Sequence, residues 1–360
     1  LSAMALGANP SSVHAAGRAA RKAVETARAQ VGGAIGSRAE DIVFTSGGPE
    51  ANALALLGAV AALDGRATLL VSAIEHEAVS QNAGLAGVPV ESVYVTRTGE
   101  LDLDYLAHRL ARWDADRDGT PVLALMLANN ETGVLQPVGE AAALVRDAGG
   151  LTHCDAVQGL GKVPISVALL GVDYLALSAH KAGGPQGVGA LWHRPGAPLK
   201  PVLHGGGQER SLRSGTENVV GIAGFGAAAD AAVAGLPAYQ ALASARDGME
   251  ARLVEEGGVV PIGVEAPRLA GVSCFARAGF KAETQVMALD LAGVAVSSGA
   301  ACSSGKVRRS VVLQAMGVAD ALADCAVRTS FGWRSAATDF DAVANAWLQA
   351  ARRTVLKESA

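Results

Sequence analysis

A lysine that follows an apolar run and opens a glycine-rich loop is the most suggestive chemical feature of this sequence. Lys181 follows the strand-like run 172–177 and precedes Gly183-Gly184. A lysine that forms a Schiff base needs a fixed position, a partly desolvated amine and anion-binding groups beside it. Ser178 and His180 could contact a phosphate group there. The pattern indicates a lysine that holds a cofactor, although many loops place a lysine between small residues.

A carboxylate in an equivalent position strengthens this interpretation. Asp155 follows the apolar segment 151–154, and Gln158 comes three residues later. Enzymes that use pyridoxal 5'-phosphate (PLP) need a carboxylate on the pyridinium nitrogen and a lysine on the aldehyde carbon. Asp155 and Lys181 could supply these two groups. The alternatives are that Asp155 caps a helix and that Gln158 is a surface amide.

Further polar residues follow other expected strands. The turn Ser46-Gly47-Gly48 precedes a helix, where backbone N–H groups can bind an anion, but it could be an ordinary turn. His76 could lie against a cofactor ring and exchange protons, or it could be a surface histidine at a helix start. Asn130 could bind a ring oxygen or serve a turn. Arg328 lies within an apolar strand pattern, and a substrate carboxylate is one possible partner.

Cys302 lies in a stretch of small residues, 297–305, that we expect to be mobile and exposed. Positive charge close behind it, at Lys306, Arg308 and Arg309, favours the reactive thiolate. Exposed thiols carry an oxidative risk, so a functional thiol is favoured over an incidental one. The other cysteines have apolar neighbours and are expected in the core: Cys154, Cys274 and Cys325.

Composition excludes several classes of protein. The 360 residues are half hydrophobic, which is ample for a large core and suggests two domains. A net charge of -4 with few aromatic residues argues against nucleic-acid binding, and no apolar stretch has the length and purity of a membrane span. The four cysteines form no CxxC pair, which favours a reducing cytoplasm, and no metal site is expected.

Helical and strand-like segments alternate through the first two thirds of the chain. This alternation predicts a mainly parallel sheet covered on both faces, with ligands at the carboxyl ends of its strands. Ser46, Asn130, Asp155 and Lys181 all follow expected strands. The expected strands are 41–45, 68–72, 88–95, 121–127, 151–154, 172–177 and 188–192, then 272–276, 294–297 and 326–330 in a second domain. The expected helices are 13–31, 49–60, 76–85, 140–148, 217–234, 283–289 and 339–355.

The ensemble resembles the cysteine desulfurases of the NifS/IscS type, within the class V aminotransferase group of fold-type I PLP enzymes. The matches run nearly end to end, and their order and spacing together are highly specific. They are Asn9-Pro10-Ser11-Ser12-Val13-His14, Phe44-Thr45-Ser46-Gly47, Glu75-His76, Asn129-Asn130-Glu131-Thr132-Gly133, Asp155-Ala156-Val157-Gln158, Ser178-Ala179-His180-Lys181, Arg213-Ser214-Gly215-Thr216 and the Cys302 loop.

The resemblance implies an α/β fold of fold-type I. Residues 10–235 would form a large PLP-binding domain with a mainly parallel seven-stranded sheet sandwiched by helices. Residues 236–360, with residues 1–9, would form a smaller α+β C-terminal domain that carries the Cys302 loop. The resemblance also implies a homodimer in which Thr216 reaches the phosphate in the other subunit's site.

The resemblance assigns a role to each cofactor-binding residue. Lys181 would hold PLP and move the substrate's α proton, and Asp155 would pair with the pyridinium nitrogen. Gln158 would contact the ring hydroxyl. His76 would stack on the ring and act in acid–base steps. The phosphate would be held by Ser178, His180 and the turn at Gly47 and Gly48.

The substrate and sulfur roles fall to three residues. Asn130 would bind near the ring oxygen and the substrate, and Arg328 would bind the substrate carboxylate. Cys302 would attack the substrate sulfur and become a persulfide. The implied reaction converts L-cysteine to L-alanine and passes sulfur to an acceptor or scaffold protein, for iron–sulfur cluster or thio-cofactor synthesis.

Two rival functions remain. The first is another class V PLP reaction, such as that of a selenocysteine lyase. The second is a cofactor-poor homologue that acts as a binding partner. It is motivated by the short stretch before Asn9 and by Pro49, where relatives usually carry threonine. Proline offers the phosphate neither a hydroxyl nor an N–H, a loss of up to two hydrogen bonds of about 1.5–3 kcal/mol each.

Overall fold

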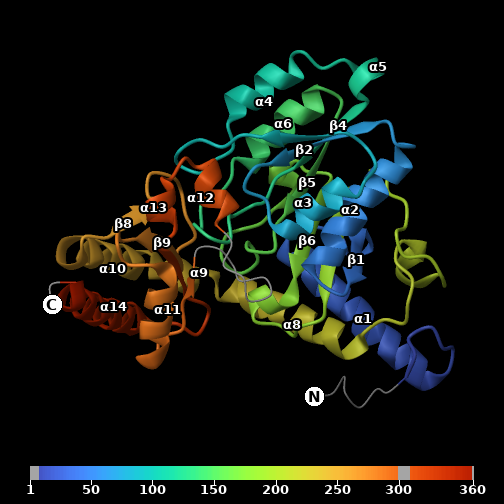
Figure 1. Ribbon diagram of the computed structural model, residues 1–360. Helices are drawn as coiled ribbons and strands as arrows, with labels where there is room; N and C mark the ends of the chain where they lie inside the picture. The colour runs from blue at the N-terminus through green and yellow to red at the C-terminus, as the bar shows by residue number, and fades with distance from the viewer. Residues whose placement is uncertain (1–7, 299–308, 359–360) are drawn as a thin grey trace. The chain divides into compact units, whose positions relative to one another are not determined.

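The computed structural model describes residues 8–298 and 309–358, and these form two compact units (Figure 1). The first unit consists of the described residues of Leu1–Val93 with Asp102–Leu127 and Pro137–Leu236. The second consists of Tyr94–Leu101, Ala128–Gln136 and the described residues of Pro237–Ala360. Two short segments of the first 235 residues therefore group with the C-terminal part of the chain. The division into domains at residues 235 and 236 stays a prediction, and it did not anticipate these two segments.

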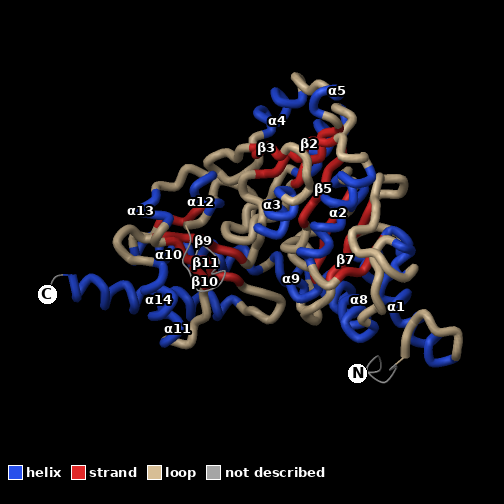
Figure 2. Tube along the Cα trace, turned by 45° about the vertical axis from the view of Figure 1, so that its right-hand side comes forward, coloured by secondary structure: helices blue, strands red, loops and turns tan. Residues whose placement is uncertain are grey.

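The first unit is built on a seven-stranded sheet with the strand order β1-β7-β6-β5-β4-β2-β3. Strands β2, β3, β5 and β7 of this sheet are labelled in Figure 2. Strand β7 is antiparallel to both its neighbours, and the other pairs are parallel. This confirms the expected mainly parallel sheet. The strands are β1 (Ile42–Thr45), β2 (Ala67–Ser72), β3 (Val90–Val93), β4 (Thr120–Ala124), β5 (Leu151–Asp155), β6 (Tyr174–Ser178) and β7 (Gly189–His193).

The central strands of this sheet are buried along their whole length. Parallel strands are buried in this way when helices cover both faces of the sheet. The helices of this unit are α1 (Ala15–Ala34), α2 (Gly48–Ala62), α3 (Glu77–Gly84), α4 (Leu103–Leu110), α5 (Ala115–Asp118), α6 (Val138–Asp147), α7 (Val167–Leu170) and α8 (Val219–Ala234). Short 3-10 turns occur at Ala39–Asp41, Ala179–Ala182 and Gln208–Ser211. Helix α1 packs mainly on α8.

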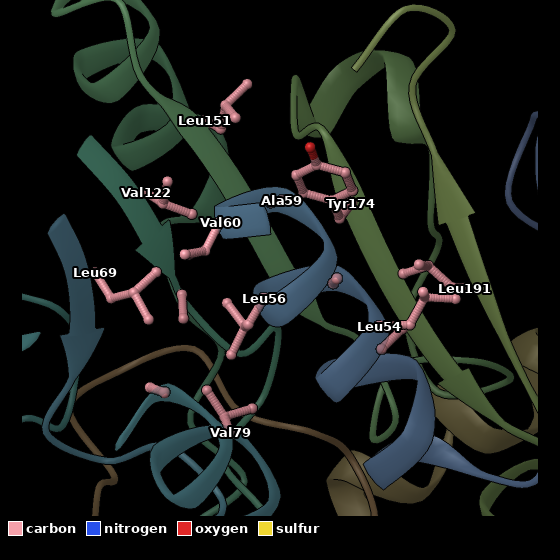
Figure 3. Close-up of a cluster of buried hydrophobic side chains, with 14 of the residues drawn as sticks. Leu54, Leu56, Ala59, Val60, Leu69, Val79, Val122, Leu151, Tyr174 and Leu191 are labelled. Carbon is pink, nitrogen blue, oxygen red and sulfur yellow. The ribbon is translucent and has the colours of Figure 1, made fainter. Parts of the chain in front are cut away.

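Helix α2 lies across the strands that matter most for the site (Figure 3). It is apolar on most of its surface and packs on β5, β6, β7 and α3, so both of its faces are covered. Leu54 and Leu56 of α2 join one buried cluster with Leu151, Tyr174 and Leu191 from three successive strands. This packing fixes the start of α2 relative to the ends of β5 and β6.

The second unit contains a four-stranded antiparallel sheet with the order β10-β11-β9-β8. Its core includes Trp347, whose indole N–H donates to Gln285 Oε1 at 2.7 Å, and a stacked pair formed by Phe331 and Phe340. The elements are α9 (Leu236–Gln240), α10 (Leu242–Gly257), β8 (Val260–Ile262), β9 (Val272–Ala276), α11 (Ala282–Leu291), β10 (Ser297–Ser298), α12 (Val311–Ala315), α13 (Asp320–Ala323), β11 (Ala326–Ser330) and α14 (Ala337–Glu358).

One expected strand was misplaced. The strand predicted over 294–297 begins only at Ser297, which pairs with Arg328 of β11. Val294 and Val296 instead pack, partly buried, against the core of this unit. Within the described residues, no single helix has the length and apolar character of a membrane span, and only the bent pair Val219–Ala234 with Leu236–Gly257 reaches these limits together.

Candidate active site

Asp155 is the last residue of β5, and its carboxylate is held between two N–H donors. Asn52 Nδ2, from α2, donates to Oδ2 at 2.8 Å, and the backbone N–H of Val157 donates to Oδ1 at 3.0 Å. The alternative expected from the sequence was that Asp155 caps a helix; a turn follows it instead, and the Val157 N–H that it accepts belongs to that turn. Side chains two residues apart in a strand share a face, so His153 lies beside Asp155 and contacts the same asparagine. His153 Nε2 is 2.8 Å from Asn52 Oδ1.

Burial raises the pKa of Asp155, and three groups oppose the increase: the Val157 N–H, the Asn52 amide and the charge of His76. His76 is the N-cap of α3, where its Nδ1 accepts a hydrogen bond from the N–H of Ala78 at 3.0 Å. The ring is exposed. The helix-start alternative for His76 is thus correct, and it leaves the ring close enough to Asp155 for their charges to interact.

Glu75 is a second acid at this edge of the sheet. Its Oε1 accepts the backbone N–H of Met126 at 2.6 Å, whereas Oε2 is buried without a hydrogen-bond partner in the described chain. Burial, followed by repulsion from Asp155, raises the pKa of Glu75 well above its ordinary value. Burial and the neighbouring Asp155 thus both favour the protonated form of Glu75.

Lys181 follows β6, the strand adjacent to β5, and lies in the short turn Ala179–Ala182. Its side chain is exposed. Ser178 is buried at the end of β6, and its Oγ lies 2.9 Å from His180 Nδ1. Burial lowers the pKa of His180, with smaller effects from the charges of Lys181 and Lys162. Two cations therefore lie near a hydroxyl and an imidazole, an arrangement suited to an anion.

The start of α2 brings the glycine turn to the same place. A Cβ atom added to Gly48 would lie 2.8 Å from Val157 Cγ2 and 3.7 Å from Ser178 Cβ. Gly48 therefore packs between the turn after Asp155 and the end of β6, where a side chain would not fit. The first N–H groups of a helix have no intrahelical partner and favour anions. Pro49, in the first turn of α2, has no N–H and removes one of these donors.

Gln158 lies half-buried after Asp155, and its Oε1 accepts a hydrogen bond from Lys162 Nζ at 2.7 Å. Because Oε1 is engaged by Lys162, the Nε2 group is the part of the Gln158 amide that can donate to a ligand. Gln158 is thus partly exposed and engaged by a lysine, and its contact with a ring hydroxyl stays a prediction.

Thr216 is exposed, in a segment that one ion pair, between Arg213 and Glu50, ties to the start of α2. Arg213 donates to Glu50 at 2.6 Å and 3.1 Å, and Glu50 also accepts the N–H of Ser46 at 2.8 Å. Burial alone would raise the pKa of Glu50, but Arg213 and Ser46 lower it overall. Glu50 thus connects the turn before α2 to the segment that carries Thr216.

In the second unit, Arg328 of β11 donates from Nη1 to the backbone oxygen of Asn130 at 2.8 Å and from Nη2 to Ser297 Oγ at 3.0 Å. Its Nε is buried without a partner among the described residues. Glu131, the residue after Asn130, accepts from Ser310 Oγ, and burial raises the pKa of Glu131 to about 7. Arg328 and Asn130 are therefore in direct contact. The sequence did not predict this contact.

The structure thus brings Asp155, Lys181, Ser178, His180 and the Gly47-Gly48 turn to one edge of the first unit, with His76 beside Asp155. Asn130 and Arg328 meet in the second unit. Cys302 lies outside the described residues. The described cysteines, Cys154, Cys274 and Cys325, are free and buried, as expected.

Sequence reasoning missed four residues of these regions, namely Asn52, His153, Glu75 and Glu131. A signal existed for His153, because strand alternation places it on the same face as Asp155. Asn52 had no comparable signal, since it is 103 residues from Asp155 in the chain.

The donor set suits PLP. A buried carboxylate that accepts from an amide and a backbone N–H matches a cationic ring nitrogen, whose charge would favour the ionised form of Asp155. The neighbouring strand end supplies a lysine, and a helix start without a side chain at Gly48 offers backbone N–H groups to a phosphate.

Comparison with known proteins agrees with this arrangement. Residues 3–343 match the family model described as aminotransferase class-V. A cysteine desulfurase of Cereibacter sphaeroides is 42% identical over 92% of this chain and 86% of its own length. The cysteine desulfurase IscS of Dictyoglomus turgidum is 39% identical over 90% of this chain and 82% of its own.

Solved structures point the same way. A NifS-like protein from Rickettsia africae superposes with a TM-score of 0.88 and 32% identity, covering 97% of this chain and 93% of that protein. The chain belongs to the class V aminotransferase family, whose members are PLP-dependent enzymes. The predicted family, fold class and cofactor are thereby confirmed.

Proposed function

We propose that this protein is a PLP-dependent cysteine desulfurase, which converts L-cysteine to L-alanine and transfers the sulfur to Cys302. The observation that carries the proposal is the placement of Asp155 at the end of β5 and of Lys181 just after the neighbouring β6, with Gly48 packed against Val157 and Ser178. The similarity to cysteine desulfurases over nine tenths of the chain supports the choice of reaction.

Each residue of the first unit then has a task toward the cofactor. Asp155 would keep a proton on the ring nitrogen of bound PLP, and Gln158 would donate to the ring hydroxyl. Ser178, His180 and the N–H groups of the Gly47-Gly48 turn would hold the phosphate. His76 would lie against the ring and exchange protons through Nε2, since its Nδ1 is engaged by the helix start.

Lys181 holds the cofactor's aldehyde carbon between turnovers and moves the substrate's α proton when its amine is free. Bound PLP supplies an electron sink for the electron pair that the substrate's Cα–H bond leaves behind. Arg328 binds the substrate carboxylate, with Asn130 beside it. The Nε of Arg328 is buried and has no hydrogen-bond partner among the described residues.

The sulfur step balances without an external oxidant. The Cys302 thiolate attacks the sulfur of the bound substrate, an S–S bond forms, and the bond from sulfur to the β carbon breaks. The electron pair of that bond remains on the β carbon, which takes up one proton, and L-alanine leaves after the α carbon has regained its own proton. The net change is L-cysteine plus the Cys302 thiol giving L-alanine plus the Cys302 persulfide.

The finer features of the proposal concern partners and location. We propose a homodimer in which Thr216 contacts the phosphate in the partner subunit's site, and an acceptor protein for iron–sulfur cluster or thio-cofactor synthesis. Arg213 and Glu50 support the first point, because they connect the Thr216 segment to the phosphate turn. The free thiols of the described cysteines favour a cytoplasmic location.

The test incubates the PLP-loaded protein with L-cysteine and measures both alanine release and the mass of the peptide that contains Cys302. We expect alanine and an added sulfur atom on that peptide, and neither in Lys181→Ala. Cys302→Ser should lose alanine formation from cysteine, whereas the buried Cys325→Ser should keep it. Higher turnover with selenocysteine than with cysteine would favour a selenocysteine lyase. A protein that stays colourless with added PLP would favour the binding-partner alternative.

A further inference from the structure

A buried chain of hydrogen bonds lies behind Asp155. It runs from His153 Nε2 to Asn52 Oδ1 at 2.8 Å, and from Asn52 Nδ2 to Asp155 Oδ2 at 2.8 Å. His153 is fully buried, and Asn52 is 1% exposed. The three side chains come from β5 and α2, two elements that also share the core cluster of the first unit.

The chemistry of the three groups gives this chain a direction. An ionised carboxylate only accepts hydrogen bonds, so Asn52 must present its NH2 group to Asp155 and its oxygen to His153. The oxygen of Asn52 also only accepts, so His153 must carry its proton on Nε2. Burial lowers the pKa of His153 to about 3, so the ring is neutral near pH 7. Its Nδ1 is buried without a partner in the described chain.

We propose that Asn52 and His153 are positioning residues that hold Asp155 as an oriented carboxylate whose charge stays available to the cofactor's ring nitrogen. The inference rests on the proposed role of Asp155. Asn52 and the Val157 N–H occupy one site on each carboxylate oxygen and so fix its plane. Both donors are neutral, and Asp155 forms no salt bridge among the described residues, although the charge of His76 lowers its pKa.

His153 acts through Asn52. An amide that is free to rotate could turn its oxygen toward Asp155, where two acceptors would repel each other. The Nε2–H of His153 opposes this rotation because it is a donor and the carboxylate is not. His153 therefore selects the amide orientation that Asp155 needs, without touching Asp155 itself.

The other titratable groups near Asp155 leave this task to Asn52. Burial raises the pKa values of Glu75 and Cys154 well above normal, which favours the protonated form of each group. His76 is exposed, and its Nδ1 serves the start of α3. Asn52 is the side chain that donates a hydrogen bond to Asp155.

Two measurements on the reconstituted protein test the inference. The first is the dissociation constant of PLP for the apoprotein, and the second is the pH at which the visible absorption band of the bound cofactor shifts. Asn52→Leu removes the donor, and Asn52→Asp replaces it with a like charge at nearly constant volume. We expect PLP to bind roughly 10- to 100-fold more weakly in both, which corresponds to one charge-assisted hydrogen bond. The pH of the spectral shift should move in the same variants.

The histidine is tested by a conservative pair and a matched control. His153→Leu removes the Nε2–H and should weaken PLP binding by about tenfold, whereas His153→Gln offers an N–H at a similar position and should restore most of it. His193→Gln is the control. His193 lies in the same row of the sheet, paired with Tyr174 as His153 is, and also has a buried Nδ1 without a partner in the described chain. It should leave both readouts unchanged.

Failure of the inference is separable from failure of the proposed function. If Asp155→Asn leaves both readouts unchanged, the role of Asp155 is wrong and the inference falls with it. If Asp155→Asn changes both but Asn52→Asp and His153→Leu do not, the inference alone is overturned. Thermal unfolding of each apoprotein identifies any variant that does not fold. If a leucine variant does not fold, the near-isosteric variant at the same position, Asn52→Asp or His153→Gln, is used in its place.

Discussion

Asp155 in the first unit and Arg328 in the second carry opposite charges, yet they are held in the same way. Asp155 accepts from an amide and a backbone N–H, and Arg328 donates to a backbone oxygen and a hydroxyl. Neither forms a salt bridge within the described residues. Buried arginines elsewhere are paired, Arg28 with Glu209 and Arg268 with Glu250.

This difference distinguishes buried charges that stabilise the fold through ion pairs from charges that remain available to bind a ligand. Removing one partner of a buried ion pair leaves an uncompensated charge, so such pairs hold elements together. A charge held only by neutral groups can still attract an opposite charge from outside. Asp155 fits a cationic ring nitrogen and Arg328 fits a carboxylate, which is what the proposed reaction requires at these two positions.

The largest effect is expected for Asp155→Asn. The amide keeps the shape of the side chain but cannot stabilise a proton on the ring nitrogen, so kcat should fall by about 10³-fold or more. Steady-state alanine formation measures this. Asp173→Asn is the matched control, because Asp173 is another buried carboxylate of this sheet but is paired with Arg194 at 2.8 Å. Equal losses of activity in the two variants would contradict the distinction between paired and unpaired charges.

Arg28→Leu tests a buried charge that is paired within the protein. Arg28 donates to both oxygens of Glu209 and stacks on Phe44, and Glu209 has a left-handed backbone with φ of 43°. Loss of the arginine leaves Glu209 buried without its cation, so the free energy of unfolding should fall by about 3–5 kcal/mol.

Chemical denaturation of the apoprotein measures this loss. The exposed Arg38, which pairs with Asp41, is the control, and Arg38→Ala should change stability little. Comparable destabilisation by both substitutions would show that the Arg28 pair is not a structural anchor.

Glu131 gives a pH-dependent comparison, because it is a buried carboxyl with a hydroxyl donor rather than N–H donors. Burial raises its folded-state pKa from 4.5 to about 7, although the Ser310 hydroxyl and Arg328 lower it. The folded protein therefore binds this proton more tightly than the unfolded chain. The stabilising effect is complete below pH 4.5, declines as the pH rises to about 7, and is lost above that pH.

Glu131→Gln, which can still accept from Ser310, removes this decline. Between pH 4.5 and 7 the unfolding free energy of the variant should gain on that of the parent by about 3 kcal/mol at most. Thermal unfolding across this pH range is the measurement. A constant difference between variant and parent would mean that Glu131 is ionised in the folded protein.

Arg328→Lys should have the smallest of these effects. Lysine keeps the charge but loses the planar guanidinium, which contacts Asn130, Ser297 and a carboxylate together. KM for L-cysteine should rise by roughly 10- to 50-fold, with a smaller change in kcat. Arg334→Lys, at an arginine that stacks on Trp333, is the control. A fall in kcat with constant KM would assign Arg328 a role other than carboxylate binding.

Much of the fold could be predicted from the sequence, because apolar periodicity acts locally. All seven strands of the first sheet lie within a few residues of their expected positions. The errors have tertiary causes. Val294 and Val296 have strand-like side chains but pack as core residues, and β8 was missed because Pro261 interrupts its pattern. Proline is acceptable there because β8 is an edge strand.

The candidate site shows the same division between what local sequence patterns predict and what tertiary packing determines. The sequence by itself determined which chemistry is possible, since a lysine, a carboxylate and a glycine turn each follow an apolar run and parallel strands end at a common edge. Only the tertiary structure decided that Asn52 reaches Asp155 across 103 residues, that Glu75 is a buried acid, and that Arg328 contacts Asn130 across 198 residues. Periodicity reports which face of an element is buried, whereas partners from distant elements depend on how helices pack on the sheet.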